Sequence, residues 1–224
     1  MRIARLLLAV AALAVTACTS VTVDEMRRQA DLIMDDGDYV VVLGRRQSSN
    51  YETEPELVSC ISSSLRSNDI PVVPEEEFVD GLYPWFEPRI APMRVKEMNR
   101  LLKRKLVADR IDAYRVRYII WVDGNTETVN SSGSIGCSVG AGGIGCFGFG
   151  TWDKQSDYEA TVWDYRQLTN LGKVSADVEG TSYMPAVIIP IPLIAKVQKN
   201  ACKALAAQLS NFFVSPDNAG GNEE

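Results

Sequence analysis

Apolar residues recur along this chain with two spacings, which together predict a domain built from strands and helices. Continuous apolar runs at Tyr39 to Leu43 and at Tyr118 to Val122 are typical of strands covered on both faces. After Pro55 the apolar residues recur at helical spacing, and the same spacing returns from Ala195 to Phe213. The run from Ile70 to Val73 predicts an edge strand, because its proline has no N–H for a strand ladder.

Weaker patterns predict the remaining elements. Residues 92 to 110 have the longest helical pattern, and its core-facing residues are expected to be Met98, Leu101, Leu102 and Leu106. Residues 157 to 165 and 173 to 182 alternate in polarity and flank a turn, which predicts an antiparallel hairpin. Residues 19 to 37 are polar and predict a leader with a helix over residues 24 to 35.

The order of these elements is β-α-β-α-β-β-β-α, which predicts an α/β fold with helices packed on a mixed sheet. An α+β arrangement is the alternative. A chain of 224 residues suits one globular domain, which we assign to residues 38 to 214. Residues 18 to 37 are expected to be a tether, and the polar residues 215 to 224 a disordered tail.

The first 17 residues predict a sorting signal rather than a structural element. Two arginines precede an apolar run from Leu6 to Val15, which is too short for a membrane span. The sequence Val15-Thr16-Ala17-Cys18 resembles the bacterial lipobox, and this resemblance implies cleavage before Cys18 and acylation of its thiol. In lipoproteins an aspartate after this cysteine favours the inner membrane, so Thr19 implies the outer membrane. A plain secretory signal is the alternative.

Charge and composition narrow the possible functions. Removal of the signal's two arginines changes the formal net charge from −6 to −8, and an acidic domain is poorly suited to nucleic acid. The chain has no histidine, which excludes Ser-His-Asp and Cys-His nucleophile pairs and any histidine-containing zinc site. We therefore predict no cofactor and no metal site.

The four cysteines after Cys18 are expected to form disulfides, because the periplasm is an oxidising compartment. Four cysteines allow three pairings. The simplest joins Cys137 to Cys146 across a glycine-rich segment and Cys60 to Cys202 between two predicted helices. A four-thiolate zinc site is the alternative, but the spacing contains no Cys-x-x-Cys pair.

The glycine-rich segment from Ser131 to Gly150 predicts a disulfide-closed loop between two strands. Residues 140 to 145 satisfy the G-x-G-x-x-G pattern, but the strand and helix that a dinucleotide site requires do not flank it. No charged residue occurs from Ser131 to Trp152, so a membrane or subunit contact is an alternative. The apolar stretch from Tyr183 to Ile194 is either a buried connector or a docking patch, and its prolines exclude a membrane-spanning helix.

Two groups of charged residues each have two interpretations. The carboxylates of Glu75, Glu76 and Glu77 either interact with the dipole of a short helix after Pro74 or form a catalytic group. The helix predicted over residues 92 to 110 is basic on one side, which is either a solvated face or a surface for anionic lipid or an acidic partner. Its basic residues are Arg94, Lys96, Arg100, Lys103, Arg104, Lys105 and Arg110.

Several motifs resemble those of a set of uncharacterised proteobacterial outer-membrane lipoproteins. The matching segments are Cys146 to Phe149, Asp157 to Ala160, Val162 to Asp164 and Pro190 to Ala195. The element order is distantly similar to the periplasmic domain shared by the amino-terminal part of TolB and the curli secretion lipoprotein. The resemblance implies an envelope lipoprotein and transfers no catalytic residue. The glycine-rich segment lacks the clear alternation that a membrane-inserting hairpin of the curli type requires.

The sequence thus predicts a non-enzymatic lipoprotein, anchored at Cys18 to the periplasmic face of the outer membrane. Its expected role is structural, or that of an assembly module whose partner is a second copy of the chain or another envelope protein. The alternative is a periplasmic hydrolase that uses carboxylates for acid/base chemistry, because no imidazole is present.

Overall fold

A single six-stranded sheet organises the molecule. The computed structural model describes residues 19–28, 32, 34–45, 53–87, 90–92, 94–140, 143–190 and 194–213. The strands are β1 (Thr19–Arg27), β2 (Tyr39–Gly44), β3 (Val72–Val73), β4 (Val116–Gly140), β5 (Gly143–Asp164) and β6 (Thr169–Pro190). The helices are α2 (Pro55–Ser67), α3 (Glu75–Gly81), α4 (Val95–Leu102), α5 (Lys105–Ala113) and α6 (Val197–Phe213).

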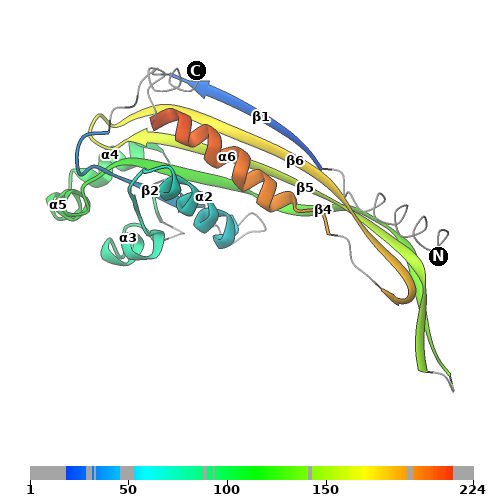
Figure 1. Ribbon diagram of the computed structural model, residues 1–224. Helices are drawn as coiled ribbons and strands as arrows, with labels where there is room; N and C mark the ends of the chain where they lie inside the picture. Colours follow the sequence, from blue (N-terminus) through cyan, green and yellow to red (C-terminus); the bar gives the residue numbers. More distant parts are fainter. Residues whose placement is uncertain are drawn as a thin grey trace, which may run out of the picture.

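The strand order in the sheet is β1-β6-β5-β4-β2-β3 (Figure 1). Strands β3, β2 and β4 run parallel and are linked through helices, whereas β4, β5, β6 and β1 run antiparallel. The predicted α/β class with a mixed sheet is therefore confirmed. The proline in the run from Ile70 to Val73 excludes a longer ladder there, and β3 is the short edge strand that this run predicts.

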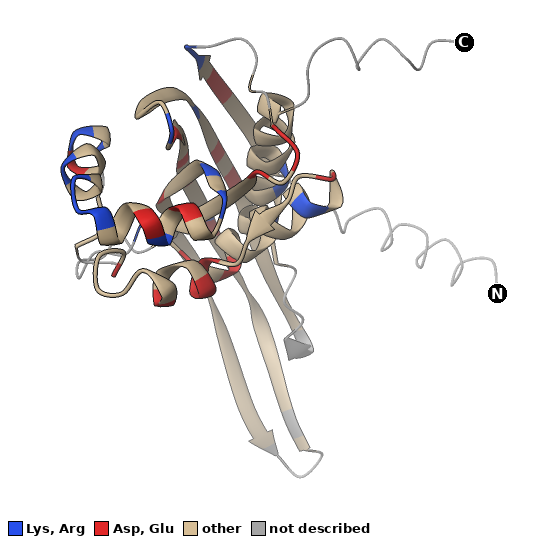
Figure 2. Ribbon diagram, turned by 90° about the vertical axis from the view of Figure 1, so that its left-hand side faces the viewer, with Lys and Arg blue, Asp and Glu red and all other residues tan. Residues whose placement is uncertain are grey.

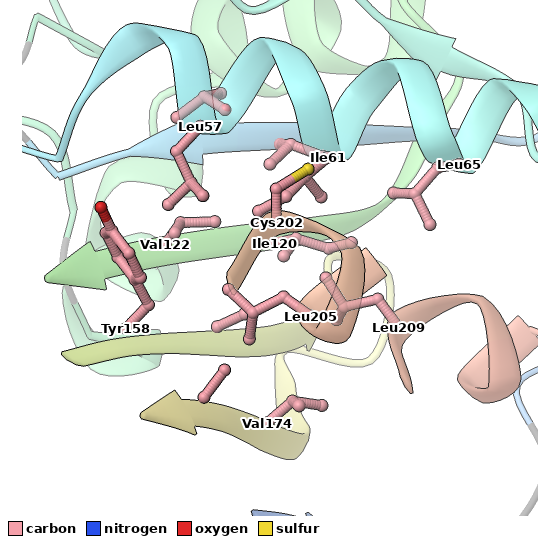
Figure 3. Close-up of a cluster of buried hydrophobic side chains, with 14 of the residues drawn as sticks. Leu57, Ile61, Leu65, Ile120, Val122, Tyr158, Val174, Cys202, Leu205 and Leu209 are labelled. Carbon is pink, nitrogen blue, oxygen red and sulfur yellow. The ribbon is translucent and has the colours of Figure 1, made fainter. Parts of the chain in front are cut away.

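Helices α2 and α6 cover one face of the sheet and form the larger core (Figure 3). Leu57, Ile61 and Leu65 extend from α2 at helical spacing, and Leu205 and Leu209 extend from α6. They pack on the alternate residues of β4, β5 and β6 that include Ile120, Val122, Tyr158 and Val174. The disulfide between Cys60 and Cys202 joins the two helices, with the Cα atoms 6.2 Å apart.

The opposite face of the sheet is covered at one end by α3, α4 and α5. Phe78 of α3, Met98 of α4 and Ile111 of α5 are buried there against β2 and β4. Trp121 and Trp163 lie on neighbouring strands with their ring centroids 6.2 Å apart in an edge-to-face arrangement. The three helices cover only the end of the sheet near the start of β4, so no helix of the described residues lies over the rest of this face (Figure 1).

The leader predicted as helical over residues 24 to 35 is instead strand over residues 24 to 27, and residues 28, 32, 34 and 35 lie in no helix or strand. Strand β1 pairs with β6 from Thr19 opposite Gly180 to Arg27 opposite Gly172. Within β1 only Thr19 and Val23 are half-buried, and the other residues are exposed. The segment therefore lacks the apolar pattern by which a buried strand is recognised in a sequence. The backbone of β6 supplies the hydrogen bonds that make this polar segment extended.

The single helix predicted over residues 92 to 110 is also wrong, because the chain forms two helices separated at Lys103 and Arg104. The break changes which residues face the core. Met98 is buried as expected, but Leu106 is 58 % exposed, and Val107 and Ile111 are buried in its place.

The glycine-rich segment is not a loop but the far part of the β4–β5 hairpin, so this prediction was wrong as well. The ladder continues from Tyr118 opposite Asp164 to Gly140 opposite Gly143. One residue, Val129, has no partner in the ladder and forms a bulge between Thr128 and Asn130. Small residues hide the alternation in the sequence, because glycine and serine give no apolar signal on either face.

The Cys60–Cys202 disulfide should stabilise the fold more than the Cys137–Cys146 disulfide. The first closes a loop of 142 residues and the second a loop of 9. In the chain-entropy model these correspond to about 5 and about 3 kcal/mol. Replacing Cys60 and Cys202 by alanine should lower the urea midpoint clearly, and replacing Cys137 and Cys146 should lower it less. Equal losses in the two double variants would contradict this ranking.

Candidate interaction surface

The most distinctive feature of the molecule is a long hairpin that projects beyond the helices. We call residues 131–140 of β4 and 143–152 of β5 the arm. It extends from the helix-covered part of the sheet and is uncharged over its whole described length (Figures 1 and 2). Cys137 and Cys146 are directly paired in the ladder and joined by a disulfide, with a Cα–Cα distance of 4.0 Å. The arm is thus covalently closed near its tip.

Apolar side chains on the arm are open to solvent. Val139 is 80 % exposed, Phe147 63 % and Phe149 48 %. The ring of Phe149 lies 6.1 Å from that of Tyr183 on β6, so the two aromatic residues share one face. Large exposed apolar side chains that gather on one element indicate a contact surface.

The glycine-rich segment and the apolar stretch that begins at Tyr183 are separate in the sequence but lie side by side in the sheet. Residues 183 to 188 of β6 pair with residues 151 to 146 of β5. The stretch from Tyr183 onward is therefore part of the sheet up to Pro190, and residues 191 to 193 lie outside the described part. This part of the stretch is thus a strand rather than a buried connector, with Ala186 buried and Tyr183 and Pro185 partly exposed, and its role as a docking patch stays a prediction.

Two glycines allow the strands of the arm to approach each other closely. Gly133 has φ of 104° and faces the carbonyl oxygen of Phe149, and Gly148 has φ of 146° and faces that of Ser134. A Cβ atom at either position would collide with the opposite backbone. At these two positions glycine is therefore required by the geometry of the hairpin.

The buried carboxylates hold the fold together and do not converge on a cavity. Asp38 is buried and accepts hydrogen bonds from Arg166 and from Arg117, whose Nη1 atom is 3.2 Å away. Asp164 is also buried and accepts a 2.8 Å hydrogen bond from the backbone N–H of Gln167. Burial raises the pKa of Asp38, but the hydrogen bonds from the two arginines outweigh it, so the pKa lies below its ordinary value.

The acidic residues that the sequence offered as a catalytic group lie in the first turn of α3. Glu75 accepts a 2.8 Å hydrogen bond from the backbone N–H of Gly44, which fixes the helix against the end of β2. A cavity of about 540 Å³ lies beside it, and its acidic lining residues are Glu75, Glu76 and Asp80. None of the three is buried, so their surroundings lack the desolvation that prepares a carboxylic acid for general acid catalysis.

The described residues contain neither a cluster of metal ligands nor a membrane-spanning helix. Within the ranges given above, no group of three or more Cys, Asp or Glu side chains is arranged to hold a metal ion. No helix in the described part of the chain is both long and apolar enough to cross a bilayer. Cys18, the predicted acylation site, lies outside the described residues.

Two groups of like charge lie on different parts of the surface, and the acidic group combines residues that are far apart in the sequence. Asp157 and Asp177 are paired across neighbouring strands, and Asp24 and Glu179 lie close to them. Burial and the repulsion of these carboxylates raise the pKa of Asp177. The basic residues of α4 and α5 form a second surface, on which Lys96, Arg100, Lys103 and Arg104 are exposed.

Comparisons with known proteins provide a fold likeness and no family. No protein-family model matches the chain, and no curated protein matches it. Among solved structures, a PelC dodecamer from Paraburkholderia phytofirmans is similar at 15 % identity and a TM-score of 0.42, covering 86 % of this chain and 97 % of that one. A one-substitution variant of the same protein gives 15 %, 0.41, 86 % and 98 %. These values are too low to support an inference about role.

Loss of the Asp38 carboxylate should destabilise the protein. Asp38→Asn removes the buried carboxylate that Arg117 and Arg166 share, while Arg117 keeps Asp35 and Asp164 as acidic neighbours. The free energy of unfolding should therefore fall by roughly 2 kcal/mol, the value of hydrogen bonds to a charged group. Because the folded-state pKa of Asp38 is lowered, its stabilisation is full above the unfolded value of about 3.9 and is lost as pH falls further. Urea titrations should show the difference between wild type and variant shrinking below about pH 4. The exposed neighbour Asp36, changed to Asn, is the control and should cost little.

Proposed function

We propose that this chain is a lipid-anchored lipoprotein of the bacterial cell envelope that acts without catalysis as an assembly or interaction module. The proposed anchor is Cys18, exposed after removal of residues 1–17, and the proposed location is the periplasmic face of the outer membrane. The single observation that supports an interaction role is the arm, an uncharged extension with exposed Phe147 and Phe149.

The proposed domain organisation changes in one respect. The globular domain of residues 38–214 is joined by β1, so residues 19–27 of the expected tether belong to the sheet. Cys18 would then be attached to the body without a spacer, because β1 begins at the next residue. Residues 215–224 remain a proposed polar tail.

The hydrolase alternative has less support than the interaction module. A carboxylate dyad requires one acid with a raised pKa and one ionised partner in the same site. The deeply buried carboxylates Asp38 and Asp164 instead interact with arginines and backbone N–H groups, and neither lines the cavities beside Glu75, Asp123 or Lys196. Their arrangement is that of structural ion pairs.

Self-association is a second element of the proposal, supported by the separation of charge. The carboxylates around Asp177 on the sheet and the exposed cations of α4 and α5 are complementary in sign and lie on different parts of one chain. Contact between the acidic surface of one copy and the basic surface of the next is heterologous, and such contacts build rings or filaments.

Replacement of Cys18 tests the anchor. Cys18→Ser should abolish incorporation of radiolabelled palmitate and leave the chain out of the membrane fraction. Thr19→Asp is the informative control, because the lipoprotein sorting pattern predicts that it keeps the acyl chains but moves the protein to the inner membrane. Continued acylation of Cys18→Ser would show that the anchor has been misassigned.

Self-association should depend on salt. Light scattering of the unacylated chain from Thr19 onward should give a mass above that of a monomer at low ionic strength and a lower mass at high ionic strength. Reversing the charges of Arg100 and Lys103 to Glu should lower the mass, whereas the exposed Lys203→Glu on α6 should not. A monomeric mass at every salt concentration would rule out this contact.

A further inference from the structure

The position of the first strand determines which end of the sheet lies next to the amino terminus. Strand β1 begins at Thr19, which pairs with Gly180 of β6, and Gly180 pairs with Lys154 of β5. The next residue pair towards the tip is Asp153 with Thr181, and the arm begins one pair further, at Trp152. In Figure 1, β1 starts on the side from which the arm projects and points away from it. The base of the arm and the start of β1 are therefore neighbours.

This arrangement has a consequence for the membrane if Cys18 is acylated, so the inference below rests on the proposed function. Cys18 directly precedes Thr19, whose hydroxyl oxygen accepts a 3.0 Å hydrogen bond from Asn200 of α6. No flexible spacer separates the acyl chains from the folded sheet. The end of the sheet with the arm is thus held at the lipid surface, while α4 and α5 lie at the opposite end (Figure 1).

The arm has the dimensions and composition of an element that contacts lipid. The strand from Lys154 to Gly143 extends for about 35 Å at 3.3 Å per residue, similar to the bilayer's hydrocarbon thickness of about 30 Å. Trp152 and Tyr183 lie at its base, where amphipathic rings suit the membrane–water interface, and Phe147 and Phe149 lie nearer the tip. The nearest charged residues along β5, Asp153 and Lys154, directly follow Trp152 and lie on the side of the base that faces away from the tip.

The outer edge of β4 determines whether the arm is more stable in the bilayer core or at the lipid–water interface. Strand β4 pairs with β2 only as far as Val122, so within the described residues its outer edge has no partner strand along the arm. Each unsatisfied backbone group in hydrocarbon costs several kcal/mol. The arm of a single copy is therefore more stable at the headgroup level, where water and headgroups satisfy these groups, than in the bilayer core.

We propose that the arm is a membrane-contacting element that lies in the lipid interface and inserts the side chains of Phe147 and Phe149. Together with the acyl chains at Cys18 it gives the sheet a second attachment to the lipid surface, which fixes the orientation of the domain. The contact is apolar, so it needs no anionic lipid and does not weaken with salt.

Binding of the unacylated chain to vesicles tests the arm without the anchor. The chain from Thr19 onward should co-sediment with vesicles of phosphatidylcholine, a zwitterionic lipid, and binding should be equal at low and high salt. Phe147→Ser combined with Phe149→Ser should lower the partition coefficient at least tenfold. Leu106→Ser on α5 removes an equally exposed apolar side chain far from the arm and should leave binding unchanged.

Other outcomes of this experiment would overturn the inference. Absence of binding, or equal binding by the arm variant, removes the membrane role of the arm. Binding only to phosphatidylglycerol vesicles, lost in salt and unaffected by the arm variant, assigns lipid contact to the basic helices instead. If the arm variant forms a smaller assembly than wild type in light scattering but binds vesicles equally, the arm is a contact between protein chains. Because the chain tested carries no acyl group, none of these results bears on acylation of Cys18.

A second measurement uses the acylated protein in vesicles and reads the depth of the arm directly. Phe147→Trp places a fluorescent reporter on the arm, and Leu106→Trp places one on α5. Lipids brominated near the headgroup should quench the reporter at residue 147 more strongly than lipids brominated near the chain end, and neither should quench the reporter at residue 106. Equal quenching at the two positions, or no quenching at residue 147, would contradict an interfacial arm.

Discussion

The long antiparallel ladder between β4 and β5 is the interaction on which the rest of the structure depends. At one end it contains Ile120, Val122 and Tyr158, which are buried beneath α2 and α6. At the other end the same hydrogen bonds hold two strands that none of the helices α2 to α6 covers. The exposed arm therefore needs little core of its own, because its register is set in the buried part of the sheet and carried outward by backbone pairing.

Much of the fold follows from local residue patterns. The continuous runs around Val41 and Ile120 predict central strands, and the spacing of Leu57, Ile61 and Leu65 predicts α2. The pairing of Cys60 with Cys202 belongs to the simplest of the three pairings that four cysteines allow, and the structure contains it. These elements bury their apolar residues in a regular way, so their periodicity is visible in the sequence.

The elements that escaped prediction owe their conformation to neighbours rather than to their own composition. Strand β1 is polar, and β6 makes it extended. The arm is rich in glycine and serine, and its strands continue because the ladder behind them does. The acidic surface around Asp177 combines residues from three strands, and Asp38 reaches Arg117 and Arg166 from distant parts of the chain. No local spacing encodes such contacts.

The bulge at Val129 has a consequence for how this hairpin can change in length. Side chains alternate between the two faces of a strand, and directly paired residues lie on the same face. The unpaired Val129 shifts the pairing of β4 with β5 by one residue. Before the bulge Thr126 is opposite Ser156, and after it Cys137 is opposite Cys146. A deletion of one residue from β4 that left the bulge in place would exchange its two faces beyond that point, and Cys137 would turn away from its partner. Evolution can therefore lengthen or shorten this hairpin by matched pairs of residues, while single insertions or deletions are tolerated only if a bulge is gained or lost with them.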